Sequence, residues 1–169
     1  MPHSMPVSKL MIERNEWPQL RGDMDVSTAI RILRIITEDQ KLEHGHSTPL
    51  ILDEKYNLLG FVHLTDLLKA IRHLCDKPDE RCDLPEATTK LKELVVPFAG
   101  TVQPDDSILK ALDIMMDHNV SQVPVMRDGK LQGIVKLSDI FNTVAALLFD
   151  EQDPEERDRL LRDYDLERA

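Results

Sequence analysis

The chain has 169 residues, a hydrophobic content of 41% and a formal net charge of −10. This length suits one domain or two small ones that share a core. The acidic balance argues against nucleic-acid binding, which needs a basic surface, and no apolar run approaches the ~20 residues that a membrane-spanning helix requires. The N-terminus lacks the basic start and continuous apolar stretch of a signal peptide. We therefore expect a cytoplasmic globular protein that binds neither nucleic acid nor membrane.

The first half of the chain predicts a strand, a helix, two strands and a second helix. Apolar residues recur at the three- and four-residue steps of a helix at Ala29, Ile32, Leu33 and Ile36. Ser27 or Thr28 is the candidate N-cap of this helix. Predicted strands at 48–52 and 58–63 flank a polar turn, and a helix over 66–74 follows, with Thr65 as its expected N-cap.

The second half predicts the same order of elements. A helix is marked by Ile108, Leu112, Met115 and Met116 and follows a candidate cap within 105–107. Strands at 123–126 and 131–136 flank Asp128-Gly129, a strong hairpin signal because glycine accepts the positive φ that a tight turn needs. A helix over 139–149 follows, with Ser138 as its expected N-cap.

An internal repeat relates the two halves. The segment GFVHLTDLL at 60–68 returns as GIVKLSDIF at 133–141, and the upstream segment STPLI at 47–51 corresponds to QVPVM at 122–126. Internal repeats fix the architecture of a chain. We therefore predict an α+β fold of two tandem β-α-β-β-α repeats, packed in pseudo-two-fold symmetry with a cleft between them.

The repeat divides the chain into five predicted segments. They are an N-terminal extension at 1–6, the first repeat at 7–75, a charged linker at 76–88, the second repeat at 89–149 and a tail at 150–169. The tail carries nine acidic and four basic residues, so it holds half of the net charge of −10. The segment Asp153-Pro154-Glu155-Glu156 within it has the proline and acids suited to a first helical turn. We expect a solvated helix there, or one that docks on a partner.

The repeated segments resemble the CBS domain family, and the pair resembles a Bateman module. The resemblance covers the chain from about Val7 to Phe149. The family's diagnostic stretch runs from a glycine through a Ser or Thr to an aspartate, which 60–66 and 133–139 match at the glycine and the aspartate. It implies two clefts, each able to hold an adenosine-type ligand such as AMP, ADP, ATP or S-adenosylmethionine.

The candidate ligand-binding residues are the equivalent positions of the two motifs. Asp66 and Asp139 are expected in the first turn of a helix, where a carboxylate is favoured and can accept hydrogen bonds from two ribose hydroxyls. Gly60 and Gly133 would let backbone approach a flat base closely. The other candidates are an apolar slot at Val123 and Pro124, and backbone at Thr101 and Val102 that could read the edge of an adenine. A helix-terminal carboxylate without a ligand is the alternative for both aspartates.

The sequence departs from the family at the hydroxyl residue, which is His63 in the first repeat and Lys136 in the second. The resemblance implies that this hydroxyl contacts ribose or phosphate. Lys136 could instead pair with a phosphate as a point charge, and His63 could do so when protonated. The alternatives are a solvent-exposed strand end for Lys136 and a histidine without a ligand for His63.

Metal and enzyme sites find little support. His73, Cys75 and Cys82 form one cluster and His44 and His46 another, but neither has the paired spacing of a structural zinc site. The chain has no nucleophile elbow, no phosphate-cradling glycine loop and no His-Glu-x-x-His pair. We expect no catalytic activity, no required cofactor and no resident metal.

The sequence leaves two main functional hypotheses and a weaker third one. The first is a stand-alone regulatory module that binds an adenine nucleotide or adenosyl ligand and acts on a protein target in trans, or as a piece of a longer chain. The second is a dimerisation or protein-interaction module with degenerate ligand sites, and the third is a divalent-cation sensor. The resemblance implies a flat homodimer, whose expected contacts are Leu68, Ile71, Leu147, Leu148 and Phe149.

Overall fold

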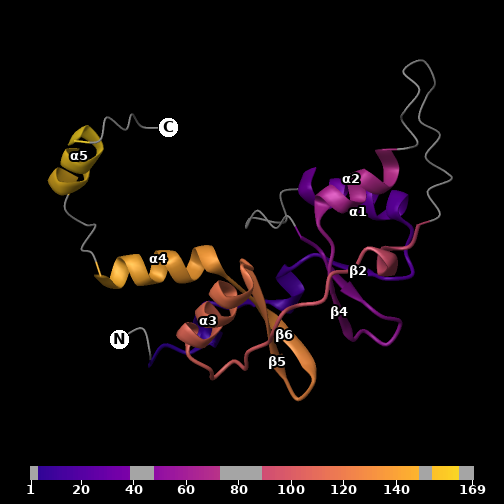
Figure 1. Cartoon of the computed structure of the whole chain (residues 1–169), viewed down its shortest axis with the longest axis horizontal. Coiled ribbons are helices and arrows are strands. Elements are labelled where there is room, and N and C mark those ends of the chain that lie inside the picture. The colour runs from indigo at the N-terminus through magenta and orange to yellow at the C-terminus, as the bar shows by residue number, and fades with distance from the viewer. Residues whose placement is uncertain (1–3, 39–47, 73–88, 149–153, 164–169) are drawn as a thin grey trace.

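The computed structural model describes residues 4–38, 48–72, 89–148 and 154–163 of the chain (Figure 1). The linker, the cysteines and the histidines at 44, 46 and 73 lie outside these residues, as does Phe149. The elements are 3-10 helix η2 (Val7–Lys9), β1 (Ile12–Glu13), 3-10 helix η3 (Arg14–Glu16), β2 (Gln19–Arg21), α1 (Val26–Glu38), β3 (Leu50–Leu52), β4 (Leu58–Phe61), α2 (Leu64–Arg72), 3-10 helix η6 (Leu91–Glu93), α3 (Ile108–His118), β5 (Gln122–Arg127), β6 (Lys130–Lys136), α4 (Leu137–Leu148) and α5 (Pro154–Asp163).

The predicted α+β fold of two repeats is confirmed. The first repeat contains β2, α1, β3, β4 and α2, and its sheet has the order β2-β3-β4. The second contains α3, β5, β6 and α4, and its first strand is reduced to a parallel bridge from Val102 to Val125. Each repeat packs its helices on its own strands around a separate apolar cluster.

The helices form where the apolar periodicity predicts them, but three of the expected caps are wrong. The predicted cap of α3 is confirmed, since the Ser107 hydroxyl accepts a hydrogen bond from the Leu109 amide at 3.1 Å. Helix α1 is capped by Asp25, whose carboxylate accepts from the Thr28 amide at 2.8 Å. Helices α2 and α4 begin at Leu64 and Leu137, so Thr65 and Ser138 lie inside the first turn.

The N-cap position of each second helix is taken by the residue that replaces the family's hydroxyl. The carbonyl of His63 accepts the first helical hydrogen bond, from the Asp66 amide at 3.0 Å, which defines His63 as the cap. Lys136 ends β6 and directly precedes α4. The Lys136 ammonium has no acceptor and cannot cap a helix amide, and His63 offers a ring nitrogen in place of the hydroxyl oxygen that caps prefer.

The strand pairing corrects the alignment of the two repeats. Pro124 lies opposite Ile134, whereas Leu50 lies opposite Phe61, the equivalent of Ile134. The prolines of the two repeats therefore occupy different positions, one residue apart in register. The hairpin predicted at Asp128-Gly129 is confirmed, with φ of 51° and 73° and a pairing of Arg127 with Lys130.

The first residues of each repeat pack on the other repeat, so the two repeats exchange their N-terminal segments. Ile12 of β1 pairs antiparallel with Ile134 of β6, in the second repeat. Val96 pairs antiparallel with Phe61 of the first repeat through two backbone hydrogen bonds of 2.9 and 3.0 Å. The 3-10 helices are exchanged in the same way. Helix η2 places Val7 in the core of the second repeat, and η6 places Leu91 in the core of the first.

A third apolar cluster joins the repeats. Trp17 is buried within it, and its indole N–H donates to the Thr48 carbonyl at 3.0 Å. The side-chain amide of Gln122 donates to the Thr48 hydroxyl. Since Thr48 and Gln122 occupy equivalent positions, this contact lies at the pseudo-two-fold axis. The cluster contains Ile12, Trp17, Leu50, Phe61, Leu131 and Ile134.

Candidate functional site

The motif aspartates occupy equivalent places in the two repeats. Asp66 lies in the first turn of α2 and Asp139 in the first turn of α4. Their side chains are 29% and 32% exposed, so both are half-buried and open to solvent. The positive end of a helix dipole favours a carboxylate at this position. Each aspartate can therefore accept hydrogen bonds from a bound molecule.

Each aspartate faces a different lysine. In the first repeat, Nζ of Lys69 lies 3.4 Å from Oδ1 of Asp66, and the Lys69 side chain is 75% exposed. In the second repeat, Nζ of Lys136 lies 3.8 Å from Oδ2 of Asp139, and the Lys136 side chain is only 20% exposed. The two sites thus share their carboxylate and differ in the position and burial of the accompanying cation.

His63 takes the place of Lys136 in the first repeat. Its side chain is exposed, and its ring packs edge-on against Phe61 with centroids 4.9 Å apart and planes at 89°. Phe61 contacts Phe98 at the same centroid distance. The residue that replaces Lys136 in the first repeat thus packs on an aromatic pair.

The predicted base-binding residues of the second repeat lie together on neighbouring strands. Val102 and Val123 are both buried in the core of this repeat, while Thr101 is exposed. The Val102 amide donates to the Pro124 carbonyl at 3.1 Å, and its carbonyl accepts from the Met126 amide at 2.8 Å. The backbone of Val102 is thus engaged in the sheet, which makes Thr101 the more accessible of the two for an adenine edge.

The motif glycines have a structural partner that the sequence did not indicate. A Cβ atom on Gly133 would overlap the Ile12 carbonyl, and one on Gly60 would overlap the Val96 carbonyl. The absence of a side chain at both glycines therefore allows the backbone at Ile12 and at Val96 to pack closely against them. Their contact with a flat base stays a prediction.

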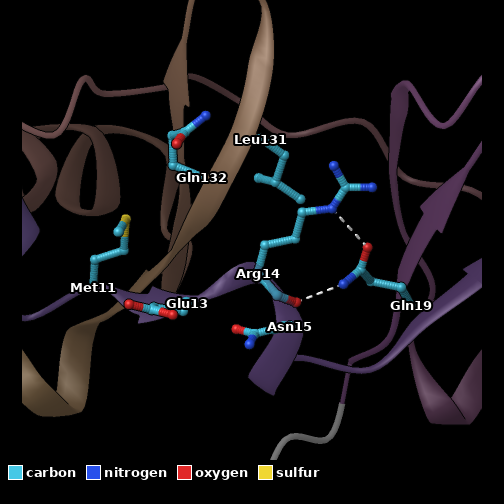
Figure 2. A pocket seen from close by; sticks show the side chains of 7 residues that line it. All are labelled: Met11, Glu13, Arg14, Asn15, Gln19, Leu131 and Gln132. Atoms are coloured by element: carbon cyan, nitrogen blue, oxygen red, sulfur yellow. Dashed lines mark hydrogen bonds between the residues drawn. The ribbon is translucent and has the colours of Figure 1, made fainter.

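Two cavities are lined by described residues, and neither includes Asp66 or Asp139. One, of about 480 Å³, lies between η3 and β6 and is shown in Figure 2. Within it, Nε of Arg14 donates to the Gln19 side chain at 3.0 Å, and the Gln19 amide donates back to the Arg14 carbonyl. The other, of about 270 Å³, is bordered by Met115, Met116, Asn119, Val120, Ser121 and Leu137. Sequence reasoning singled out none of the polar residues in these cavities, because no motif marks them.

The CBS domain family matches residues 7–73 and 91–146, which together make up more than half of the chain. The chain therefore belongs to the CBS domain family and contains two CBS domains. Each match begins with the exchanged 3-10 helix and ends in the helix that carries the motif aspartate. No curated protein matches the chain.

Solved structures of CBS domain proteins share the fold. CBSX2 in complex with AMP is 19% identical, with 85% of this chain and 98% of that chain covered and a TM-score of 0.61. The cytosolic domain of the Mg²⁺ channel MgtE in complex with ATP is 24% identical, with 79% and 46% covered and a TM-score of 0.60. The CBS domain of a bacterial CNNM/CorC family Mg²⁺ transporter is 18% identical, with 83% and 75% covered and a TM-score of 0.63.

Two further findings concern the described residues. None of their helices is long and apolar enough to cross a membrane. Within the same residues, no group of three or more His, Cys, Asp or Glu side chains is arranged to hold a metal ion. The divalent-cation hypothesis therefore has no preformed cluster to support it in this part of the chain.

Proposed function

We propose that the protein is a non-catalytic regulatory module that binds an adenine nucleotide in the clefts between its CBS domains. The observation that carries this proposal is the pair of half-buried aspartates, each in the first turn of a helix and at equivalent positions of the repeats. A carboxylate there can accept both hydroxyls of a ribose. The positive end of the helix dipole at the same place favours a phosphate.

The solved structures support the class of ligand. CBSX2 holds AMP and the cytosolic domain of MgtE holds ATP, and both share this fold. The second repeat is the better nucleotide site of this chain, because it combines Asp139 with Lys136 and with the strand pair that carries Thr101 and Pro124.

A nucleotide can regulate only by binding one arrangement of the module more tightly than another. We expect the two clefts where the repeats meet, so the arrangement that changes would be the orientation of one repeat, or one subunit, relative to the other. The regulated protein would then read that orientation in trans or within a longer chain.

A thermal-shift and calorimetry panel of AMP, ADP, ATP and S-adenosylmethionine tests the proposal. A ligand at ~100 times its dissociation constant adds about 2.7 kcal/mol to the stability of the native state. Asp139→Asn should abolish most of this shift, because the amide cannot accept both ribose hydroxyls. The unliganded melting temperature should change little, since the side chain is half-buried at a helix start.

Asp117→Asn is the matched control, since Asp117 is an exposed helical carboxylate of α3 away from the motif. It removes the same charge and should leave the ligand shift intact. An Asp139→Asn protein that keeps the full shift would exclude this residue as the ribose anchor. Absence of a shift with every ligand in the wild type would refute nucleotide binding.

A second candidate function, assembly with another protein or a second copy, is favoured by exposed apolar side chains on α2 and α4. Leu68 is 59% exposed, Phe141 69% and Leu148 65%. Exposed apolar residues gathered on one surface mark interaction sites. We propose that these helices form a homodimer contact, which sedimentation of the chain with and without nucleotide would detect. Of the expected contact residues, Ile71 is half-buried and Leu147 is 48% exposed.

A further inference from the structure

We infer that Lys136 makes the second site selective for phosphorylated adenine ligands over neutral adenosine and cationic S-adenosylmethionine. The inference rests on the proposed nucleotide site and goes further by naming the ligand class and the residue that selects it. The geometry around Asp139, compared with that around Asp66, supplies the argument.

The ammonium group of Lys136 lies beside the motif carboxylate and is mostly shielded from solvent. Its side chain is 20% exposed, and its ammonium lies 3.8 Å from the carboxylate of Asp139. A lysine that extends freely into solvent would show a much larger exposed fraction, as Lys69 does at 75%. Lys136 occupies the position at which the family motif has a Ser or Thr hydroxyl. A positively charged donor therefore replaces a neutral one.

The first repeat lacks this arrangement. At the position of Lys136 it has His63, which is exposed and packs on Phe61. Its lysine, Lys69, lies one turn into α2 and pairs with Asp66 from the solvent side. An exposed pair of this kind is screened by water and salt and contributes little. Only the second repeat thus combines its motif aspartate with a largely buried cation.

The charges at the second site favour an anion. The carboxylate of Asp139 and the ammonium of Lys136 cancel, while the start of α4 adds the positive end of its dipole. A phosphate can approach the ammonium and the helix amides while Asp139 accepts the ribose hydroxyls. A sulfonium or ammonium group in the same place would meet a like charge, which is unfavourable at short range. Adenosine gains nothing from the ammonium.

The test is isothermal titration of AMP, adenosine and S-adenosylmethionine into wild type and Lys136→Ser, which restores a hydroxyl. Wild type should bind AMP more tightly than adenosine, and the preference should fall at high salt. Loss of one charge-assisted hydrogen bond should reduce the AMP-to-adenosine affinity ratio by about tenfold or more in Lys136→Ser. Affinity for S-adenosylmethionine should rise relative to AMP.

Lys110→Ser is the matched control, because it removes a lysine of α3 that pairs with Asp106 at 2.8 Å, and neither residue belongs to a motif. It should keep the wild-type ratio, and thermal unfolding of both variants verifies their fold. A ratio unchanged by Lys136→Ser would overturn the role of Lys136 while leaving nucleotide binding in place. Wild type that binds none of the three molecules would instead refute the proposed function, and the inference with it.

Discussion

Gly133 determines how closely the exchanged strand can approach its partner. It lies in β6 opposite Glu13, and the carbonyl of Ile12 occupies the space that a side chain on Gly133 would need. The neighbouring obstacle is backbone, which cannot move aside as the end of a flexible side chain can. The sequence analysis assigned this glycine to the approach of a flat base, which stays a prediction. It could not predict the partner, because the residue that fills the space is more than a hundred positions away.

Gly133→Ala should therefore lower the stability of the unliganded protein. Overpacking typically costs 1–3 kcal/mol, and here the added methyl would displace β1 or distort β6. Chemical denaturation with the midpoint and slope recorded measures the effect. Gly100→Ala is a suitable comparison, since its methyl would meet only the Ile114 side chain, at 3.2 Å. Equal stability of the Gly133 variant and wild type would show that β1 does not pack as described.

At the scale of single elements, the apolar periodicity located α1 and α3, and their place after a hairpin located α2 and α4, whereas the starts of the helices were less predictable. Thr65 and Ser138 fit the sequence rule for a cap but lie inside their helices, because α4 begins directly after the last residue of β6 and only two residues separate the end of β4 from α2. Asp25 was overlooked in favour of Ser27 and Thr28. A short polar side chain suits each of these positions, so composition alone does not decide among them.

The cap of α1 predicts an acid-sensitive helix start. Hydrogen bonds from the Ser27 hydroxyl and then the Thr28 amide lower the pKa of Asp25 from 3.8 to about 2. Since the pKa is lower in the folded state, the contribution of Asp25 is present above pH 4 and is lost as the pH falls toward 2. Asp25→Ala should thus lower the melting temperature at pH 7, and the difference from wild type should shrink toward pH 2.

Thermal unfolding followed by circular dichroism across this range measures the difference. Asp23→Ala serves as the control, because Asp23 is a nearby exposed carboxylate that pairs with Arg21 and does not cap a helix. A gap between Asp25→Ala and wild type that stays constant down to pH 2 would contradict the assignment of the cap to Asp25.

At the scale of the whole molecule, the repeats were predictable and their interlocking was not. The repeated segments identified two similar units, but the residues that cross between them lie upstream of the motif and carry no signature. Val7 and Ile12 lie at the start of the first repeat and are buried against the second. Leu91 lies at the start of the second repeat and is buried in the first. Neither unit can complete its core alone.

Removal of residues 1–13 should therefore destabilise the second repeat although that repeat is intact in sequence. Each buried aliphatic side chain contributes about 1.5–3 kcal/mol, so the loss of Val7 and Ile12 is large against the 5–15 kcal/mol of a typical domain. Hydrogen exchange of β6 and α4 measures it. Removal of residues 154–169 is the control, since α5 buries none of its residues. If removal of residues 1–13 left the hydrogen-exchange protection of β6 unchanged, the packing of the N-terminal segment on the second repeat would be contradicted.

The pairing of Ile12 with Ile134 also sets the order of events when the protein is made. During synthesis the outer strand of one sheet leaves the ribosome more than a hundred residues before the strand it must join. The early portion of the chain therefore waits, with Val7 and Ile12 uncovered, until β6 has been synthesised. Contacts so distant in sequence slow folding, and the interval exposes an apolar segment that chaperones could bind.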